Sequence, residues 1–206
     1  MQNKAEKFWD RAAGSYDREE KKDEKIYLQI ADRIKANVKS THRLLDFGCG
    51  TGRIANEIAG YVQTIDAIDI SSNMIKQARK KAEAQNISNV EYSQTTVFDK
   101  KLPTGYFDVI TAFYILHLAE DTQAVIQRIF ELLKPGGLLL SATPCMAEKP
   151  FLNLLYSVLG RVGIIPKISS FTRYELEQLL ANERFIIAEN TKLIETSNQY
   201  FMVAKK

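Results

Sequence analysis

Short apolar runs and helical apolar repeats alternate along most of the chain, which predicts alternating strands and helices. Strand-like runs are expected at 43–47, 64–69, 90–95, 107–113 and 138–143. Between them, apolar residues recur at the three- and four-residue spacing of amphipathic helices, at 26–38, 74–82 and 125–133. Strands that alternate with helices pair in parallel through right-handed crossovers. The pattern therefore predicts an α/β fold.

The C-terminal part of the chain predicts one more helix and two more strands. Thr172 and Glu175 have the spacing of a capping box, which starts a helix that we expect to run to about Ala181. The strand-like runs at 185–189 and 199–204 follow with only a short connection. We expect them to form an antiparallel hairpin at the edge of the sheet.

Three glycines at alternate positions, Gly48, Gly50 and Gly52, stand between the first apolar run and a helical pattern. Without side chains they permit positive φ and let a ligand approach the backbone closely. We expect the following helix to begin near Thr51 and to point unpaired amide groups toward a ligand carboxylate or phosphate. Asp46 ends the preceding strand, on the side where ligands bind in open α/β sheets. The loop indicates a nucleotide-cofactor site, with an ordinary strand-to-helix turn as the alternative.

Asp69 ends the second predicted strand, about twenty residues after the glycine loop. A carboxylate at this offset can accept hydrogen bonds from both hydroxyls of an adenosine ribose. The alternative is that it caps the helix that Ser71 or Ser72 opens. We expect Asp69 to bind ribose.

The loop with its aspartate, the acidic end of the second strand and the later run 132–138 together resemble the class I S-adenosylmethionine-dependent methyltransferases, in particular members that act on small molecules. The resemblance covers nearly the whole chain. It implies a Rossmann-like, doubly wound sheet of seven strands, mostly parallel with an antiparallel last strand, and helices on both faces. It also implies S-adenosylmethionine as cofactor, S-adenosylhomocysteine as product and no metal.

The competing interpretation is a dinucleotide-binding dehydrogenase. That fingerprint, G-x-G-x-x-G, places its third glycine five residues after the first. Here Gly52 lies four residues after Gly48, and Arg53 holds the dehydrogenase position. The spacing favours adenosylmethionine over a dinucleotide.

The resemblance assigns cofactor binding to the loop, to the strand ends and to the N-terminal segment. The residues are Tyr16, Asp46, Gly48, Gly50, Gly52, Asp69, Ile70, Met74, Thr96, Val97 and Phe113. Family members often hold the adenine amino group with an acidic residue where this chain has Thr96. A threonine hydroxyl can accept one hydrogen bond but carries no charge. Asp99 is the alternative for adenine recognition.

The exit of the fourth strand is expected to face the sulfonium, so that Phe113, Tyr114 and His117 line the reaction chamber. Methyl transfer from a sulfonium is an in-line displacement, and alignment and exclusion of water supply much of its acceleration. A general base is needed only for an acceptor that arrives protonated. His117 is the candidate base, with a packing role as the alternative. His42 precedes the first strand, at the opposite end of the sheet.

The N-terminal segment resembles the lid of many small-molecule methyltransferases. Tyr16 matches the tyrosine that closes over the methionine end of the cofactor. Phe8 and Trp9 are candidates for the acceptor pocket. For these two residues the alternative is an amphipathic helix whose aromatic side chains simply pack on the sheet.

Acceptor identity is expected to reside in the insert 144–170, which is rich in apolar residues. An apolar segment over the mouth of the site indicates a small apolar or aromatic acceptor. A dimer contact and a transient contact with a membrane surface are the alternatives. The candidate substrate contacts are Phe8, Trp9, Tyr114, His117, Phe151 and Tyr156.

The composition, with 206 residues, 45% hydrophobic, 26% charged and a net charge of +3, is that of one globular domain. We divide it into an N-terminal helical lid at 1–40, a cofactor-binding core at 41–143, the insert at 144–170 and a C-terminal helix and hairpin at 171–206. Cys49 and Cys145 lack the spacing of a disulfide framework or a metal site. The N-terminus lacks the apolar core of a secretory signal, and no apolar stretch is long enough to span a bilayer. We expect a cytoplasmic monomer or homodimer with no stable membrane insertion.

Two other functions stay open. A nucleic-acid or protein methyltransferase is the enzyme alternative, but the fourth strand lacks the Asn/Asp-Pro-Pro-Tyr type of motif, and no nucleic-acid partner is expected. The basic cluster Lys76, Arg79, Lys80 and Lys81 is most simply a solvated helix surface. A non-catalytic module that binds adenosylmethionine and acts by interaction is the alternative from a different class.

Overall fold

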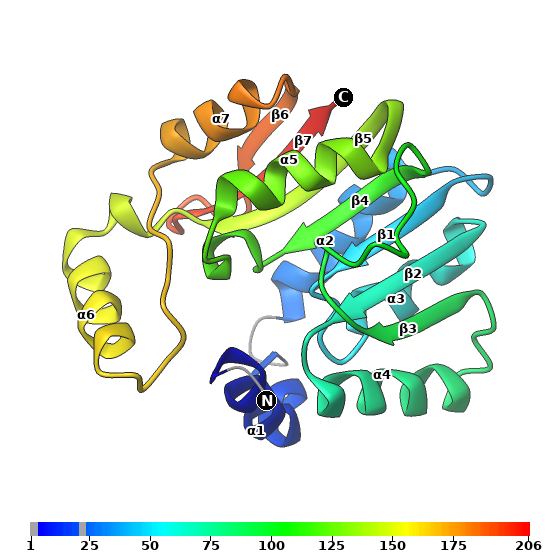
Figure 1. Ribbon diagram of the computed structural model, residues 1–206, viewed down its shortest axis with the longest axis horizontal. Helices are drawn as coiled ribbons and strands as arrows, with labels where there is room; N and C mark the ends of the chain where they lie inside the picture. The colour runs from blue at the N-terminus through cyan, green and yellow to red at the C-terminus, as the bar shows by residue number, and fades with distance from the viewer. Residues whose placement is uncertain (1–3, 21–23) are drawn as a thin grey trace.

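The computed structural model describes residues 4–20 and 24–206. Seven strands form one sheet with the order β3-β2-β1-β4-β5-β7-β6 (Figure 1). The strands are β1 (Arg43–Phe47), β2 (Thr64–Asp69), β3 (Val90–Gln94), β4 (Phe107–Phe113), β5 (Leu133–Pro144), β6 (Ile186–Lys192) and β7 (Gln199–Lys205). Strands β1 to β5 pair in parallel, and β7 is antiparallel to both of its neighbours. The predicted fold class is confirmed.

Helices cover both faces of the sheet. One face carries α2 (Glu24–Asn37), α3 (Arg53–Ile58) and α4 (Ser72–Ala84), and the other carries α5 (Thr122–Leu132) and α7 (Arg173–Asn182) (Figure 1). Successive strand residues point to opposite faces. Leu44 and Leu140 therefore join the first core, while their neighbours Leu45 and Leu139 join the second. Burial on both faces explains why the central strands carry apolar residues at adjacent positions rather than in strict alternation.

The C-terminal hairpin is confirmed, and β7 inserts between β5 and β6. The edge strand β6 runs to Lys192, beyond the predicted end at 189. Its last residues are polar and give no apolar signal in the sequence, but their backbones pair with β7. Strand β5 begins at Leu133, which pairs with Phe107 across an irregularity in register. The apolar pattern alone placed that start at 138, after the glycines.

Two helices lie beyond the sheet, both on the side where the parallel strands end (Figure 1). They are α1 (Lys4–Glu20) and α6 (Pro150–Arg161), and α6 lies inside the predicted insert. Short 3-10 turns complete the chain at η2 (Ala59–Tyr61), η3 (Leu116–Leu118) and η4 (Met146–Glu148). Within the described ranges, no helix combines the length and apolar character that crossing a bilayer requires.

Candidate functional site

A cavity of about 380 Å³ opens at the carboxyl ends of the parallel strands. The strand order reverses between β1 and β4, which is where open α/β sheets bind their ligands. Its volume lies within the range of small-molecule sites. Many residues expected at a cofactor or substrate site line it, namely Trp9, Tyr16, Gly48, Gly50, Asp69, Ile70, Met74, Thr96, Val97, Phe113 and Tyr114.

The glycine loop forms the floor of this cavity. Gly48, Gly50 and Gly52 all have positive φ, at 75°, 53° and 77°. A Cβ on Gly48 would come within 2.8 Å of the Ile115 side chain, so the loop and the exit of β4 pack closely. Any side chain at Gly48 would therefore both strain the backbone and push against the cavity wall.

Gly52 serves packing rather than the cavity lining. A Cβ there would meet the Tyr92 hydroxyl at 2.5 Å and the Ala78 Cβ at 2.9 Å. Helix α3 begins at Arg53, two residues after the predicted start near Thr51, and it has six residues. The Thr51 hydroxyl is buried and donates to Asp17 Oδ1 at 2.6 Å. The third glycine thus lets α3 and α4 approach each other.

Asp69 lies in the cavity wall with both carboxylate oxygens already oriented. Its Oδ2 accepts from the Gly50 amide at 3.0 Å, and its Oδ1 accepts from the Ser71 amide at 2.8 Å. Burial raises the pKa of Asp69, and the two amide donors oppose that shift. The N-cap of α4 is Ser71, whose hydroxyl accepts from the Met74 amide. Each Asp69 oxygen keeps capacity to accept a further hydrogen bond.

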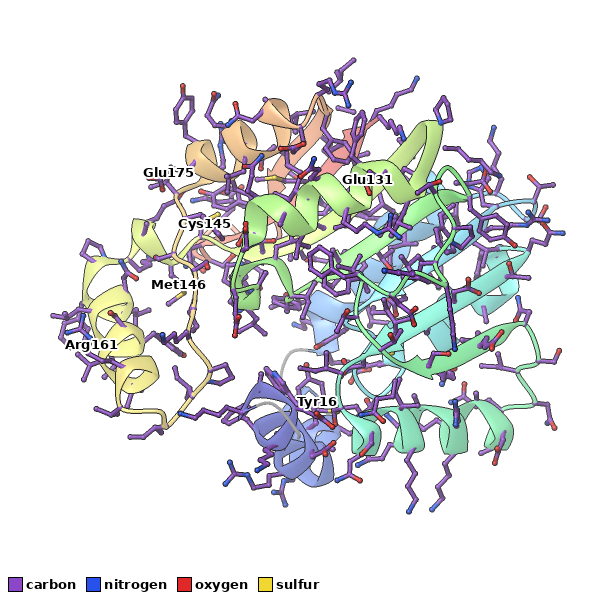
Figure 2. The ribbon with its side chains drawn as sticks, viewed as in Figure 1. Tyr16, Glu131, Cys145, Met146, Arg161 and Glu175 are labelled. Atoms are coloured by element: carbon purple, nitrogen blue, oxygen red, sulfur yellow. The ribbon has the colours of Figure 1, made fainter. Side chains whose placement is uncertain are left out.

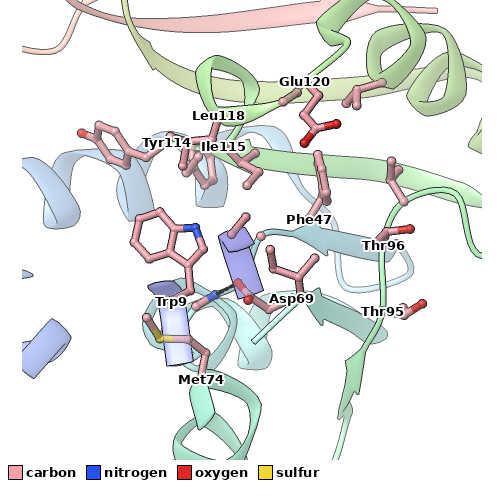
Figure 3. A pocket seen from close by; sticks show the side chains of 18 of the residues that line it. Trp9, Phe47, Asp69, Met74, Thr95, Thr96, Tyr114, Ile115, Leu118 and Glu120 are labelled. Carbon is pink, nitrogen blue, oxygen red and sulfur yellow. Dashed lines mark hydrogen bonds between the residues drawn. The ribbon is translucent and has the colours of Figure 1, made fainter. Parts of the chain in front are cut away.

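The segment that follows β3 forms the wall opposite α1. Thr95, Thr96 and Val97 line the cavity there, across from Trp9 (Figure 3). Asp99 accepts hydrogen bonds from the Thr95 hydroxyl at 2.8 Å and the Lys101 amide at 2.9 Å, and it is not part of the lining. These bonds lower the pKa of Asp99. Thr96 is therefore better placed than Asp99 to meet a ligand.

Tyr114 holds an unusual backbone conformation where β4 leaves the sheet. Its φ is 55°, which is rare for a bulky residue and is found preferentially at functional sites. Its amide donates to Ala142 O at 2.8 Å, and its hydroxyl donates to Gln199 Oε1 at 3.0 Å. The rings of Phe113 and Phe201 stack behind it, with centroids 6.2 Å apart. The neighbouring strands thus hold Tyr114 in place.

Helix α1 docks on the start of α4. Asp10 Oδ1 accepts from the Ser71 hydroxyl at 2.6 Å and from the Asn73 amide at 3.1 Å. Gln77 Nε2 donates to Ala13 O at 2.8 Å. A carboxylate is favoured at this position because the first amides of α4 lack helical partners. The helix therefore has a fixed orientation.

The docked α1 turns its aromatic side chains toward the cavity. Trp9 and Tyr16 make an edge-on contact with ring centroids 6.2 Å apart, and both line the cavity. The Trp9 indole reaches between Met74 and the segment of Tyr114 (Figure 3). Phe8 packs edge-on against Trp9 at 5.1 Å but does not itself line the cavity.

The cluster of basic residues on α4 is not simply solvated. Lys81 pairs with Asp17 of α1 at 2.7 Å and donates to the Thr51 hydroxyl at 2.8 Å. Arg79 donates to Tyr92 O. These cations therefore attach α1, the glycine loop and β3 to α4.

Asp46 lies beneath the loop, beside a second, much smaller hollow of about 30 Å³. Its Oδ1 accepts from the Thr111 hydroxyl at 2.7 Å. Burial raises the pKa of Asp46 to about 6, and the Thr111 hydrogen bond opposes the shift. Arg53 and Tyr27 line the same hollow, and the guanidinium lies 4.3 Å from the ring centroid. Asp46 is thus separate from the main cavity.

His117 does not reach the cavity. It lies in η3 and is buried, with 8% of its surface exposed. Burial lowers its pKa to about 4, so the imidazole is neutral near pH 7 and a weak base. Its carbonyl accepts from the Ser169 amide at 2.7 Å. The packing role is the better supported one, and catalysis by His117 stays a prediction that this position does not favour.

The two candidates in the insert also lie away from the cavity. Phe151 and Tyr156 are on α6, with 80% and 38% of their surfaces exposed, and neither lines the cavity. Arg161 marks the end of this helix and Tyr16 the inner part of α1, on separate parts of the molecule (Figure 2). The structure does not bring these two residues to the cavity, and their contact with a substrate stays a prediction.

Sequence reasoning missed a stretch of the lining that follows β4. It comprises Ile115, Leu118, Ala119, Glu120 and Asp121. The signal was its position directly after a strand end, where the next residues of a parallel sheet reach the ligand side. Among the described lining residues, the charged side chains are all acidic, those of Asp69, Glu120 and Asp121.

Comparison with known sequences gives consistent relatives. A family model described as a methyltransferase domain matches residues 38–195. The chain is 30% identical over 145 residues to the uncharacterized methyltransferase YcgJ of Bacillus subtilis, covering 68% of this chain and 57% of that protein. It is 31% identical over 138 residues to a ubiquinone biosynthesis O-methyltransferase of Actinobacillus pleuropneumoniae, covering 65% of this chain and 58% of that protein. The chain thus spans less than two thirds of the length of these relatives.

Solved structures share the fold. A chain from the complex of the Haloferax volcanii Trm112 methyltransferase activator with a methyltransferase superposes with a TM-score of 0.78 at 15% identity, over 96% of both chains. A Thermotoga maritima methyltransferase superposes with a TM-score of 0.72 at 18% identity, over 96% of this chain and 98% of that one. At these identities the likeness concerns the architecture alone.

Proposed function

Because the chain belongs to the class I S-adenosylmethionine-dependent methyltransferases, we propose that it binds S-adenosylmethionine in the cavity beneath α1 and transfers the methyl group to a small apolar or aromatic acceptor. S-adenosylhomocysteine is the product, and no metal takes part. One observation carries the proposal. The positive-φ glycine loop, the oriented carboxylate of Asp69 and an aromatic wall meet around one cavity.

The residues present fit this cofactor. Asp69 has two oxygens fixed by amide donors, so it can accept from both ribose hydroxyls without reorganising. Gly48 and Gly50 leave the floor free of side chains, so a ligand can lie against the backbone. Thr96 and Val97 occupy the wall where an adenine ring would lie. With Thr96 in place of an acid, we expect hydrogen bonding without a charge to select the base.

The charge of the lining suits a cation. When bound, the cofactor supplies a methyl group already activated on a positively charged sulfonium. Trp9, Tyr16, Phe113 and Tyr114 present aromatic faces and edges to the cavity, and its charged lining among the described residues is acidic. Aromatic rings attract cations by roughly 0.5–2 kcal/mol. The same lining disfavours an anionic acceptor, including a nucleic-acid backbone.

The residues of the chain align the acceptor with the cofactor and exclude water, and they form no covalent bond with either. Trp9 and Tyr16 exclude water from above, and the strained Tyr114 backbone fixes the wall from which an acceptor would approach. A neutral acceptor that loses its proton only after transfer needs no strong base. We therefore assign His117 a positioning role, through the Ser169 contact, rather than proton transfer.

The acceptor class rests on the apolar lining and on one relative. The stretch after β4 adds Ile115, Leu118 and Ala119 to the aromatic wall. One relative, 31% identical over 138 residues, is a ubiquinone biosynthesis O-methyltransferase. Together they place apolar compounds with a hydroxyl group first in any scan of acceptors with labelled cofactor. Firm cofactor binding without transfer to any acceptor would favour the non-catalytic module.

Isothermal calorimetry tests the cofactor assignment. We expect saturable binding of S-adenosylmethionine and S-adenosylhomocysteine. Asp69→Ala should weaken binding by about 2–4 kcal/mol, because two hydrogen bonds to a charged acceptor are lost. Asp66→Ala, on the same strand but outside the lining, is the matched control and should bind normally.

Two results would count against this assignment. Preferential binding of a dinucleotide would replace the cofactor. An unchanged dissociation constant for a folded Asp69→Ala variant, verified by its thermal unfolding, would remove Asp69 from the site.

A further inference from the structure

The outer face of α6 is apolar and exposed along its whole length. Phe151, Leu155, Val158 and Val162 recur at helical spacing, with exposed fractions of 80%, 45%, 50% and 64%. Leu154, at 64%, widens the stripe. A contiguous apolar patch of this kind marks an interaction site rather than scattered surface residues.

The fold fixes which face of α6 turns outward. Gly160 is buried on the inner side, where a Cβ would lie 3.5 Å from Pro166 O and from Lys167 Cα. The returning segment 163–170 therefore lies against the inner face. The outward direction of the apolar stripe is a consequence of this packing, and reorienting the helix would break it.

Both ends of the insert are hydrogen-bonded to other parts of the protein. The Ala147 amide donates to Phe171 O at 3.1 Å, and the Ser169 amide donates to His117 O at 2.7 Å. The Ser169 hydroxyl also donates to Ala119 O at 3.1 Å, and Ala119 lines the cavity. The exposed helix is thus attached directly to the cavity wall.

The charged residues within α6 and the returning segment have one sign, and the nearest acidic residue in sequence is Glu148, which precedes Lys149. From 149 to 174 the sequence has no acidic residue, although the chain has 25 in total. Lys149 and Arg161 stand at the two ends of α6, Lys167 follows on the returning segment, and all three are exposed. An apolar stripe with cations beside it is the pattern of a helix that lies in the interface of an anionic membrane.

We propose that α6 docks the protein on an anionic lipid surface, with the stripe of Phe151, Leu155, Val158 and Val162 in the interface and Lys149, Arg161 and Lys167 at the headgroups. A second copy of the chain is a poorer occupant, because it would bring cations opposite cations without acidic partners. A nucleic acid would leave the apolar stripe uncovered. The docking is peripheral, and it places the wall of the cavity near the lipid.

Vesicle co-sedimentation without cofactor tests the proposal independently of methyl transfer. The probes are vesicles of phosphatidylcholine alone and of phosphatidylcholine mixed with phosphatidylglycerol. At about 1 kcal/mol for each cation near the surface, three cations predict a preference on the order of 100-fold for the anionic vesicles. Arg161→Gln with Lys167→Gln should remove most of this preference.

A second variant separates the apolar stripe from the charges. Phe151→Gln with Leu155→Gln should weaken binding to both vesicle types at least tenfold, because two apolar side chains leave the interface. Ile186→Gln with Tyr61→Gln is the matched control, since these apolar residues are also exposed, at 69% and 48%, but lie elsewhere. The control should bind like the unmodified chain.

Three outcomes would overturn the proposal. The unmodified chain could fail to bind anionic vesicles, or the Phe151 and Leu155 variant could bind as well as its control. Sedimentation could instead show a dimer that this variant dissociates, which would assign the face to a second copy. None of these results changes the expected calorimetry of S-adenosylmethionine, so the two proposals fail separately.

Discussion

Helices α1 and α6 differ in composition, since α1 is highly charged and α6 is mostly apolar, and they have opposite relations to the core. Both are amphipathic, both carry aromatic residues, and both lie where the parallel strands end (Figure 1). Helix α1 is attached by polar contacts from Asp10 and Ala13 to α4 and from Asp17 to the glycine loop, and it turns Trp9 inward. Helix α6 has Gly160 buried on its inner side and its apolar stripe exposed. An apolar face thus becomes a lid only where polar partners orient it.

The largest expected effect concerns the end of the α6 insert, at His117. The pKa of this buried imidazole is lowered to about 4, from an ordinary 6.5, so the unfolded chain binds the proton first as pH falls. The contribution is therefore fully present above pH 6.5 and is lost as pH falls toward 4, by about 3 kcal/mol. Urea unfolding across this range should show the slope, and His117→Gln should reduce it.

The histidine substitution measured for comparison in that experiment is His42→Gln, at the other end of the sheet. An equal slope in the His117→Gln variant would mean that the His117 imidazole is not buried in solution. The packing of η3 beside the insert would then be looser than the structure shows.

An intermediate effect is expected from releasing α1. Asp10→Ala removes the acceptor for the Ser71 hydroxyl and the Asn73 amide, which should cost about 0.5–2 kcal/mol of stability. It should also weaken cofactor binding, because Trp9 and Tyr16 lose their fixed position. Thermal unfolding and calorimetry measure the two effects. Arg161→Ala on α6 is the control, and if it weakened cofactor binding equally, both helices would act as lids.

An effect of similar range, but on cofactor binding alone, separates the two tyrosines. Tyr16→Ala should weaken S-adenosylmethionine binding by about 0.5–2 kcal/mol, the range of an aromatic contact with a cation. Tyr156→Ala should leave the dissociation constant unchanged, because its ring does not line the cavity. A loss for Tyr156→Ala as large as for Tyr16→Ala would show that α6 folds over the mouth after all.

The central sheet could be predicted because its strands are buried on both faces, so that 44–47 and 107–113 carry apolar residues at adjacent positions, broken only by Asp46, Asp108 and Thr111. The place of Asp69 followed from strand order, since residues that end parallel strands meet at one edge. The docking of α1 could not be predicted. It depends on Asp10 meeting Ser71 and Asn73, which are more than sixty residues away in sequence.

The position of the insert also could not be predicted from the sequence. Its apolar pattern gives the face of a helix but not what covers it, and so Phe151 was placed at the cavity when it lies in the open. His117 lies outside the cavity lining for a related reason. Position after a strand end indicates nearness to the site, whereas the direction of the side chain is set by packing in η3. Thr96 was placed correctly in the lining because it continues directly from β3.

Ser71 couples the docking of α1 to binding in the cavity. Its amide donates to Asp69, and its hydroxyl donates to Asp10 of α1, so one residue belongs to both the proposed ribose contact and the lid. Closure of α1 and occupation of the cavity are then linked equilibria, with a single coupling free energy. Such coupling is reciprocal. If the cofactor stabilises the docked position of α1, the docked position must strengthen cofactor binding by the same factor.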